Sequence, residues 1–339
     1  MRGVLLFARV PMNVVCLRPL YRALEGEVPF YGTVKPPRGE EGEDTFSTLG
    51  IDVAKLPLFL ARWLPLQVYL SSDPMLVGKR CKAKVHTFHG ISFKGRAYTP
   101  KVLEYDRLFM VGPYMEERFV EKGILKRGDT RMCRVGMPKL DPLVDGTLTR
   151  EVAREGLGLG GEDRVVLYAP SWGAGSSLEG FGEEVVRCCL SLGLRLVVKL
   201  HDHTLRDPAW RERLKTWESA GVTIYRDPDV VPAMAASDLL VSDMSSVANE
   251  YLLLNRPLVT ILPPNYRQRY AQTADLESWM ATGSIVVEGV EELGGAIREA
   301  LEHPEEGSEA RLAMARRLFY NPGRATQRAV QVVRELLDG

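Results

Sequence analysis

The sequence predicts an α/β protein of two domains, each with a parallel sheet whose strands are joined by helices. Three observations support this prediction. The chain has 339 residues, which suits two domains of roughly 150 residues better than one. Short apolar runs alternate with amphipathic stretches along nearly the whole chain, as in strands joined by crossover helices. Hydrophobic residues make up 45% and charged residues 26%, so the chain can bury a full core.

The first apolar run of the chain is too short for a signal peptide. Its length and apolar character instead predict a first buried strand. The expected strands are residues 3–8, 28–33, 67–70, 83–88, 107–111 and 132–135, and the expected helices are residues 13–24 and 114–122.

The second half shows the same alternation more clearly. The expected strands are residues 164–168, 195–200, 222–225, 239–242, 258–261 and 284–287, and the expected helices are residues 183–192, 210–220, 231–236, 246–254 and 291–302.

Residues 150–163 contain four glycines and interrupt this alternation, so we place the domain boundary there, with residues 140–146 as the alternative hinge. The predicted domains are residues 1–150 and 151–322. A final helix in 323–339 follows the breaker Asn321-Pro-Gly323 and is expected to cross back to the first domain. Two such α/β units usually face each other across a cleft, with the ligand at the carboxyl ends of the strands.

Composition excludes several classes of function. The formal net charge is zero, so nucleic acid is not an expected partner. No stretch approaches about 18 apolar residues, so no membrane-spanning helix is expected. The five cysteines are scattered and form no CxxC pair, which indicates neither a zinc knuckle nor a disulfide framework. We therefore expect a cytoplasmic protein.

The strongest candidate site is in residues 239–251, where an apolar strand ends at Ser242-Asp243 and Ser245-Ser246 open a helix. Unpaired N–H groups of a first helical turn, hydroxyls and the positive end of the helix dipole together favour phosphate. Glu250 lies one turn further on, where a carboxylate can bind ribose hydroxyls. The simpler alternative is an ordinary helix cap, with Asp243 as a turn residue.

A second candidate is Lys199-Leu-His-Asp-His203, just past a predicted buried strand. His201 and His203 lack a third metal ligand at helical spacing, so a metal site is disfavoured. Donation from His201 to a phosphate oxygen is the more economical interpretation, with a turn histidine as the alternative.

A third candidate is His89-Gly90 at the end of a predicted strand. A histidine there has the reach and the pKa range of a general base, although a structural histidine fits the spacing equally well. Lys94 and Arg96 follow as potential anion contacts.

Two further segments are notable. Residues 168–177 form a strand and a glycine-serine loop that lacks the Walker A pattern, and no GxGxxG follows the first strand. Residues 56–70 are strongly apolar around Arg62 and Trp63, which fits ordinary core better than an interfacial membrane contact.

Taken in order, these motifs resemble the CDP-glycerol glycerophosphotransferase family, which includes teichoic-acid polymerases and primases. His89-Gly-Ile-Ser-Phe-Lys94 is similar to the family's His-Gly-Thr-Pro-Leu-Lys, and Tyr168-Ala-Pro-Ser-Trp172 to its Tyr-Ala-Pro-Thr-Trp. The other similar segments are Gly136-Met-Pro-Lys-Leu-Asp141, Lys199-Leu-His201, Ser242-Asp-Met-Ser-Ser-Val247 and Gly323-Arg-Ala-Thr-Gln-Arg328.

The resemblance implies two Rossmann-like domains of the GT-B type, with a CDP-linked polyol donor on the C-terminal domain and a polyol or glycolipid acceptor on the N-terminal domain. It implies catalytic roles for His89 and His201. Donor phosphates would be bound by Ser171, His201, Ser245 and Ser246, the ribose or nucleotide by Asp243 and Glu250, and the acceptor or an anion by Lys94 and Arg96. No cofactor and no metal are expected.

The predicted reaction transfers a phosphopolyol unit from this donor to an acceptor hydroxyl with release of CMP, in cell-envelope polymer or glycolipid synthesis, with a potential peripheral contact at the inner face of the membrane. Two alternatives remain open at this point. One is a GT-B glycosyltransferase or epimerase that uses a UDP-sugar. The other is a non-catalytic nucleotide-binding protein.

Overall fold

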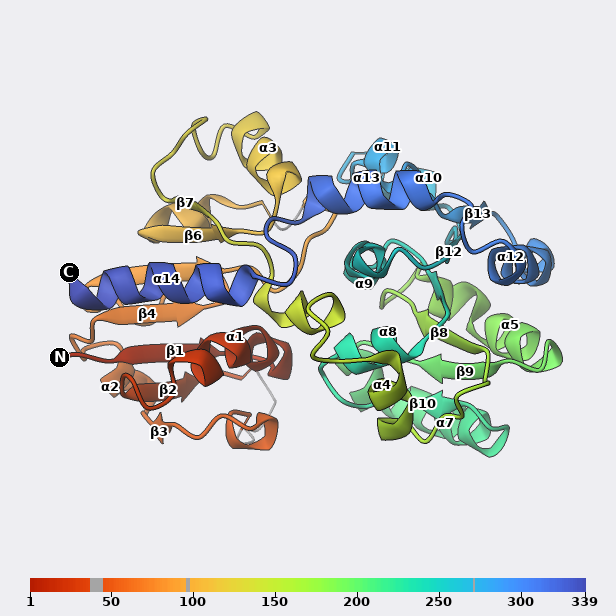
Figure 1. The fold of residues 1–339 in the computed structure, drawn as a ribbon, viewed down its shortest axis with the longest axis horizontal. Helices are drawn as coiled ribbons and strands as arrows, with labels where there is room; N and C mark the ends of the chain where they lie inside the picture. Colours follow the sequence, from red (N-terminus) through yellow and green to blue (C-terminus); the bar gives the residue numbers. More distant parts are fainter. Residues whose placement is uncertain (37–44, 96–97, 271) are drawn as a thin grey trace. The chain divides into compact units, whose positions relative to one another are not determined.

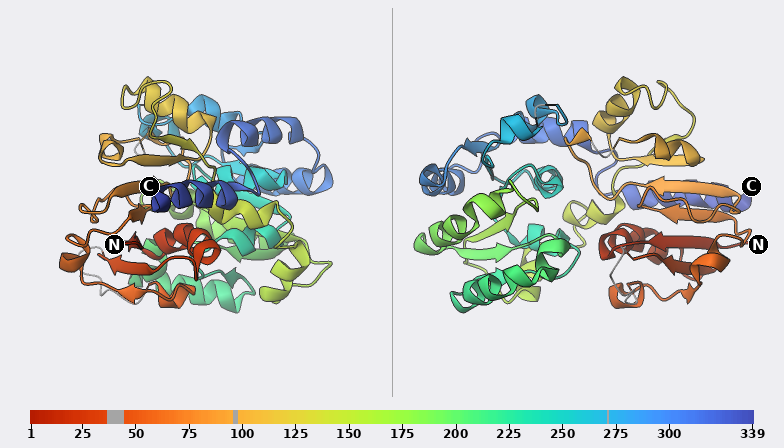
Figure 2. Two further views of the ribbon diagram at one scale, coloured as in Figure 1. Left: turned by 60° about the vertical axis from the view of Figure 1, so that its left-hand side comes forward. Right: turned by 180° about the vertical axis from the view of Figure 1, so that it is seen from behind.

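The computed structural model describes residues 1–36, 45–95, 98–270 and 272–339. The chain divides into two compact units (Figures 1 and 2). The predicted boundary was residue 150 and the predicted final segment began at 323, whereas the chain enters unit 2 at Gly146 and leaves it after Ala315. Unit 1 comprises Met1–Ile91, Tyr98–Asp145 and Arg316–Gly339, and unit 2 comprises Gly146–Ala315 with a short segment that begins at Ser92.

In the described part of unit 1, seven parallel strands form one sheet in the order β3-β2-β1-β4-β5-β6-β7. The strand order reverses beside β1, and ligands of such sheets bind at the carboxyl ends of the strands next to the reversal. The strands are β1 (Val4–Ala8), β2 (Phe30–Val34), β3 (Ala54–Lys55), β4 (Val68–Ser71), β5 (Ala83–Thr87), β6 (Arg107–Met110) and β7 (Met132–Arg134). The α-helices are α1 (Pro11–Leu24), α2 (Leu58–Ala61), α3 (Pro113–Glu121) and α14 (Ala325–Asp338).

The core of unit 1 is formed by the central strands and by two helices from opposite ends of the chain. Every residue of β1 is buried, as expected for a strand of a parallel sheet that is covered on both faces. Helices α1 and α14 contact each other on one face of the sheet, and α14 also contacts β4 (Figure 1). Val14 and Leu17 of α1 and Ala329 and Val333 of α14 belong to one apolar cluster with the strands.

The chain returns to unit 1 through close backbone contacts. The backbone N–H of Tyr320 donates to the carbonyl of Val111 at 2.7 Å. A Cβ atom on Gly112 would lie 1.9 Å from the carbonyl oxygen of Leu318, so only glycine permits this approach. The carboxylate of Asp141 accepts hydrogen bonds from the first two N–H groups of α14, those of Ala325 at 3.1 Å and Thr326 at 2.7 Å. Asp141 therefore fixes the start of α14.

Unit 2 repeats the same sheet topology. Its described strands form a six-stranded parallel sheet in the order β10-β9-β8-β11-β12-β13, which reverses beside β8. The strands are β8 (Val165–Ala169), β9 (Arg195–Val198), β10 (Thr223–Ile224), β11 (Leu239–Ser242), β12 (Leu258–Ile261) and β13 (Ile285–Val287). The α-helices are α4 (Arg150–Gly156), α5 (Ser177–Ser191), α6 (Asp202–Arg206), α7 (Pro208–Ser219), α8 (Val231–Ala236), α9 (Ser246–Tyr251), α10 (Tyr266–Tyr270), α11 (Leu276–Met280) and α12 (Val290–Glu302), and α13 (Ser308–Leu318) contains the point of return to unit 1.

The core of unit 2 lies between its sheet and the apolar faces of α5, α7 and α12. Val185 of α5, Trp217 of α7 and Ile297 of α12 are at most 2% exposed and pack with the strands in one apolar cluster. On these helices the buried residues recur at the spacing of an amphipathic helix.

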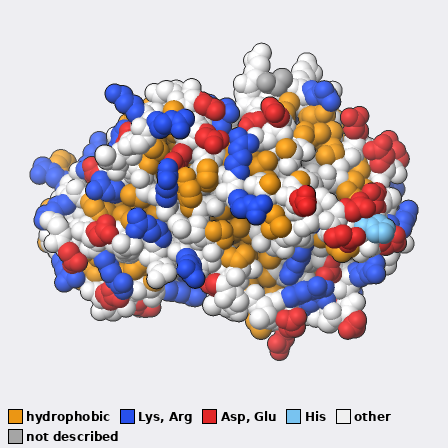
Figure 3. Space-filling model, turned by 45° about the horizontal axis from the view of Figure 1, so that its top comes forward, with side chains coloured by type: hydrophobic (Ala, Val, Ile, Leu, Met, Phe, Trp, Pro, Cys, Tyr) orange, Lys and Arg blue, Asp and Glu red, His pale blue; other side chains and the backbone are white. Residues whose placement is uncertain are grey.

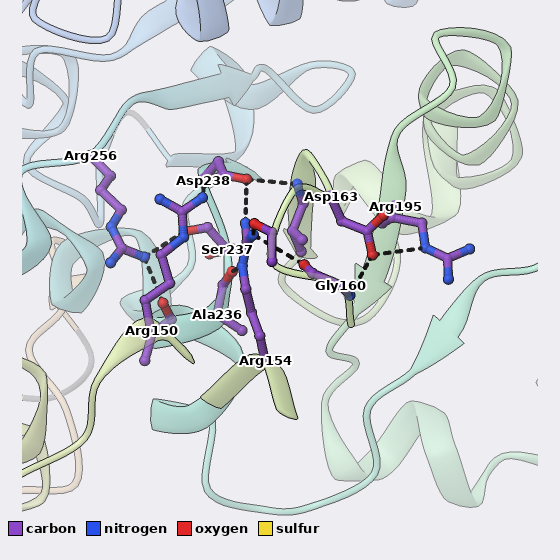
Figure 4. Close-up of polar contacts among 12 residues, drawn as sticks. Arg150, Arg154, Gly160, Asp163, Arg195, Ala236, Ser237, Asp238 and Arg256 are labelled. Atoms are coloured by element: carbon purple, nitrogen blue, oxygen red, sulfur yellow. Dashed lines mark hydrogen bonds and ion pairs between the residues drawn. The ribbon is translucent and has the colours of Figure 1, made fainter. Parts of the chain in front are cut away.

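Residues 150–156 form helix α4, whereas the sequence predicts an interruption of the alternation and a domain boundary there. A polar network anchors this helix (Figure 4). The guanidinium of Arg154 is only 3% exposed and donates to Asp238 at 2.8 Å and to the carbonyl of Ala236 at 3.0 Å. Asp238 also binds Arg150 and the backbone N–H of Val165, at the start of β8. Thr149 also caps the helix locally, because its hydroxyl accepts from the N–H of Val152 at 3.3 Å, so both local and long-range contacts hold the helix.

The other differences from the prediction are at element boundaries and in elements that were not predicted. Helix α5 begins at Ser177, six residues before the predicted start, because Ser176 caps it by accepting from the N–H of Glu179. The expected helix at 246–254 is α9 followed by a 3₁₀ turn, Leu252–Leu254. The two-residue strand β3, the short helices α2, α6, α10 and α11, and the eleven-residue helix α13 were not predicted.

On the face drawn in Figure 3, Lys and Arg side chains are interspersed with Asp and Glu. This mixture accords with the zero formal net charge of the sequence. The face presents no broad surface of one sign that would attract a polyanion.

We predict that Asp141→Ala destabilises unit 1 by about 2 kcal/mol, because one buried and one partly buried N–H group at the start of α14 lose their acceptor. Urea unfolding followed by the far-UV circular dichroism signal measures this change. Asp141→Asn keeps one acceptor oxygen and should lose less than half as much. Equal midpoints for the wild type and Asp141→Ala would contradict the capping role.

Candidate functional site

The carboxyl ends of β8 and β11 form the centre of the candidate site in unit 2. These strands are parallel neighbours, and Ser242 of β11 pairs with Ala169 of β8. Ser171 and Asp243 follow directly, next to the reversal of strand order. In an open parallel sheet this is the position at which ligands bind.

The carboxylate of Asp243 holds both ends of the loop that follows β8, residues 171–177, which we call the pinned loop. Its carboxylate accepts from the backbone N–H of Ser171 at 2.8 Å, the hydroxyl of Ser171 at 2.9 Å and the N–H of Ser177 at 2.8 Å. Asp243 is 0% exposed, and these three donors offset the cost of burying its charge. The loop between Ser171 and Ser177 is thus held at both ends by one carboxylate.

This geometry changes the roles that the sequence predicted for three residues. Both donors of Ser171 serve Asp243, so its hydroxyl has no proton left for a phosphate oxygen. Asp243 and Glu250 were expected to bind ribose, but they are 0% and 1% exposed. Neither carboxylate therefore offers surface to a ribose, and Asp243 and Ser171 shape the loop instead.

Ser245 and Ser246 lie at the start of α9, as the sequence predicted. Ser245 is the N-cap, and its hydroxyl accepts from the N–H of Val247 at 3.4 Å. Both serines are partly exposed, in contrast to Asp243. Their hydroxyls are therefore accessible to a ligand at this edge of the sheet.

His201 lies beside the pinned loop. Its ring centroid is 5.3 Å from that of Trp172, the residue after Ser171, and 5.1 Å from that of His203, with the two imidazoles nearly parallel. The Nδ1 atom of His201 accepts from the backbone N–H of His203 at 3.3 Å. A neutral His201 consequently carries its proton on Nε2, where it can donate to an anion.

Lys94 also belongs to unit 2. The N–H of Gly95 donates to the carbonyl of Thr273 at 2.5 Å, and the N–H of Asp275 donates to the carbonyl of Phe93 at 2.9 Å. This pairing places the Lys94 ammonium 5.5 Å from the ring centroid of Tyr270, whose hydroxyl interacts with Ser171. Lys94 thus lies near the loop that Asp243 holds. Arg96, the other predicted anion contact, lies outside the described residues.

His89 belongs to unit 1, where it follows β5. Its Nδ1 atom lies 3.2 Å from the carbonyl oxygen of Ser72, the residue after β4. Since a carbonyl oxygen can only accept, the Nδ1 atom carries the proton and donates it. The Nε2 lone pair is then the basic atom of a neutral imidazole.

The surroundings of His89 lower its pKa. Desolvation by the protein around the ring is the largest cause, and the Lys139 ammonium also lowers the pKa, whereas the Ser72 carbonyl and Asp73 raise it. The residue is nevertheless exposed at the surface, so this desolvation is partial. A depressed pKa keeps the imidazole neutral, the form that a general base needs.

Sequence reasoning missed the residues around His89, namely Ser72, Asp73 and Lys139, and missed Trp172 beside His201. Lys139 lies within the Gly136–Asp141 motif and Trp172 within the Tyr168–Trp172 motif. A cationic and an aromatic residue in these motifs were the signals that could have pointed to the site. Ser72 and Asp73 lie beyond β4 in no recognised pattern, and only the pairing of β4 with β5 brings them to His89.

In the part of the chain that the structure describes, no three His, Cys, Asp or Glu side chains are grouped as a metal site.

Comparison with known proteins gives consistent matches. The chain is 28% identical over 169 residues to a teichoic acid glycerol-phosphate primase of Bacillus spizizenii, covering 48% of this chain and 42% of that protein. It is 25% identical over 205 residues to a teichoic acid poly(glycerol phosphate) polymerase of Staphylococcus epidermidis, covering 53% of this chain and 28% of that protein. The matches thus span less than half the length of these curated relatives.

Solved structures share the fold. The wall teichoic acid polymerase TagF matches with a TM-score of 0.74 and 15% identity, over 99% of this chain and 89% of that chain. A putative UDP-N-acetylglucosamine 2-epimerase from Listeria monocytogenes matches with a TM-score of 0.66 and 16% identity, over 98% of this chain and 96% of that chain. These likenesses confirm the predicted GT-B type of α/β fold.

The family described as CDP-glycerol:poly(glycerophosphate) glycerophosphotransferase matches residues 77–335. This range holds the pinned loop, His201, the serines of α9, His89 and the Asp141 cap of α14. The resemblance noted in the sequence is confirmed: the chain belongs to the CDP-glycerol:poly(glycerophosphate) glycerophosphotransferase family.

Proposed function

We propose that this chain transfers a glycerophosphate-like unit from a CDP-linked donor to an acceptor hydroxyl, with release of CMP, in the synthesis of a cell-envelope polymer or glycolipid. Membership of the family supports the reaction class. The observation that carries the proposal is the cluster at the carboxyl edge of unit 2, where Asp243 holds a loop beside His201 and the serines of α9.

The donor phosphates would bind in unit 2. The hydroxyls of Ser245 and Ser246 and the Nε2–H of His201 would donate to phosphate oxygens, and the Lys94 ammonium would add a positive charge. Ser171 and Asp243 would keep the loop and Trp172 in place. This assignment concentrates neutral and cationic donors where negative charge increases during phosphoryl transfer.

The chemical step is a displacement at phosphorus. The acceptor oxygen would attack the phosphorus nearest the polyol while Nε2 of His89 takes the hydroxyl proton. A new P–O bond forms to the acceptor, and the P–O bond to the oxygen that leaves with CMP breaks. His201 would stabilise the charge that develops on the phosphate oxygens. No covalent enzyme intermediate is required, since phosphoryl transfer depends mainly on positioning and electrostatic support.

Exposed apolar and basic side chains of unit 1 support a peripheral contact with the inner face of the membrane. Phe59, Leu60 and Trp63, in and just after α2, are 65%, 42% and 66% exposed, and we call these three residues the aromatic patch. Exposed Arg62 lies beside it in sequence, and the Arg80 guanidinium lies 5.2 Å from the Trp63 ring centroid. Exposed aromatic and basic side chains favour the interface of an anionic bilayer. No helix among the described residues has the length and apolar character needed to cross a membrane.

We predict that CDP-glycerol raises the melting temperature more than UDP-sugars do and that the chain releases CMP from it with a glycolipid acceptor. His89→Ala should keep this thermal shift but slow CMP release by about 10²–10⁴-fold, as expected for loss of a general base. His201→Ala should lose the shift.

The matched control for these histidine variants is His303→Ala, because this exposed residue lies at the carboxyl end of α12 and pairs with Glu305. It should change neither binding nor turnover. Selective stabilisation by UDP compounds would instead favour a UDP-sugar enzyme. Donor binding without turnover in the presence of a competent acceptor would favour a non-catalytic nucleotide-binding protein.

We predict opposite pH shifts for two charge variants near His89. The rate rises with pH as the His89 base loses its proton, at a pKa below its ordinary value of about 6.5. Lys139→Met removes a positive charge that disfavours the imidazolium, so the acid limb of kcat/KM should move to higher pH. Asp73→Asn removes a negative charge that favours the imidazolium, so the limb should move to lower pH. Shifts in the same direction would exclude this electrostatic assignment.

We predict that vesicles containing phosphatidylglycerol sediment the chain and that neutral phosphatidylcholine vesicles bind it more weakly. Each of Phe59→Ser and Trp63→Ser should weaken binding by about tenfold or more, because burial of one large apolar side chain is worth roughly 1.5–3 kcal/mol. Leu103→Ser, at a 45% exposed apolar residue outside the patch, is the matched control. Equal binding by all these variants would rule out the aromatic patch as the contact surface.

A further inference from the structure

We propose that Asn13 is a positioning residue that acts through Ser72 to fix the tautomer and orientation of His89. The inference rests on the proposed function only where it concerns the rate of transfer. Its geometric content concerns residues of unit 1 alone: helix α1, the turn after β4 and the residue that follows β5.

Asn13 is buried at 2% exposure in the first turn of α1. Its Oδ1 atom accepts from the backbone N–H groups of Arg9 at 3.0 Å and Val10 at 3.1 Å. These two bonds occupy both lone pairs of the amide oxygen and determine which way the amide faces. The Nδ2 group therefore points away from the start of the helix.

The Nδ2 group donates to the hydroxyl of Ser72 at 2.9 Å, and that hydroxyl lies 3.5 Å from the carbonyl oxygen of Asn13. Ser72 is 0% exposed, so it has no water to replace these partners. The side chain of Ser72 is thus held by both the amide and the backbone of one residue of α1.

The backbone of Ser72 transmits this constraint. Its carbonyl oxygen accepts from Nδ1 of His89 at 3.2 Å. The same helix contacts the backbone of His89, because the thiol of Cys16, one turn after Asn13, lies 3.9 Å from the His89 carbonyl oxygen. Helix α1 accordingly contacts the histidine at its main chain and orients its imidazole through Ser72.

The consequence concerns which nitrogen of His89 is basic. A free neutral imidazole exchanges between two tautomers, and a fixed acceptor at Nδ1 selects the form with its lone pair on Nε2. If Ser72 loses its bond from Asn13, the carbonyl is free to shift and the preference weakens. Small displacements of a proton-transfer group have large effects on rate, of up to about 10²-fold for 1 Å.

The most informative variant is Asn13→Asp. A carboxylate still accepts from the N–H groups of Arg9 and Val10, so the start of α1 keeps its cap. It cannot donate to Ser72, so the Ser72 hydroxyl must turn to donate to the carboxylate and gives up its bond to the carbonyl of Asn13. Ser72→Ala breaks the same link from the other side and serves if the first variant does not fold. Asn321→Asp is the matched control, because Asn321 also lies in unit 1 and its amide donates to the carbonyls of Arg134 and Val135.

The primary measurement is the ¹⁵N spectrum of histidine-labelled protein near pH 8. The chain has five histidines, and His89→Gln assigns the signal. We expect the Nδ1–H tautomer of His89 in the wild type and in Asn321→Asp, and a mixture or the Nε2–H tautomer in Asn13→Asp and Ser72→Ala. A wild type in the Nε2–H form, or variants that keep the wild-type tautomer, would overturn the inference.

The second measurement is turnover of CDP-glycerol. Asn13→Asp and Ser72→Ala should each lower kcat by about 10–100-fold with KM for the donor changed less than threefold. The double variant should be no slower than the slower single variant, because both break one link. A changed tautomer with unchanged kcat would also overturn the positioning role. If the wild type does not turn over any CDP-linked donor, the proposed function fails, while the spectrum still decides the geometry.

Discussion

The constraint on which the rest of this structure depends is the reversal of strand order in each parallel sheet. Beside β1 in unit 1 and β8 in unit 2, neighbouring strands are reached by crossovers in opposite directions. The loops after the two central strands therefore diverge, and polar groups can occupy the carboxyl edge without breaking the apolar core. The candidate residues of both units lie after strands at this edge.

Each unit meets the same physical problem at its carboxyl edge, namely how to hold polar groups rigidly at the end of a buried sheet. Unit 2 uses one buried carboxylate, Asp243, whose three hydrogen bonds fix both ends of a glycine-rich loop. Unit 1 uses a neutral relay from Asn13 through Ser72 to His89. This relay places no formal negative charge beside the imidazole, although the Ser72 carbonyl itself raises the pKa of His89.

Some family motifs have structural rather than chemical roles. Asp141 of the Gly136–Asp141 motif caps α14, which begins within the Gly323–Arg328 motif, so two segments far apart in sequence form one joint. Ser171 and Asp243 are similarly bound to each other, because the Ser171 hydroxyl donates to the Asp243 carboxylate. The residues that remain accessible for chemistry in unit 2 are fewer: Ser245, Ser246, Lys94 and the pair His201 and His203 beside Trp172.

The sequence by itself determined the α/β class, most strands and their order along the chain, and the residue types of the site, because apolar periodicity and strand-end motifs are local signals. It also determined the family, through six motifs in the right order. Only the tertiary structure decided that residues 150–156 form a helix anchored by Asp238, that Asp243 and Glu250 are buried, and that Ser72 orients His89. These facts depend on residues that are distant in the sequence, such as Asp238, 84 residues after Arg154, and Ser72, 17 residues before His89. Hydrogen-bonding capacity shows its use only when folding brings donor and acceptor together.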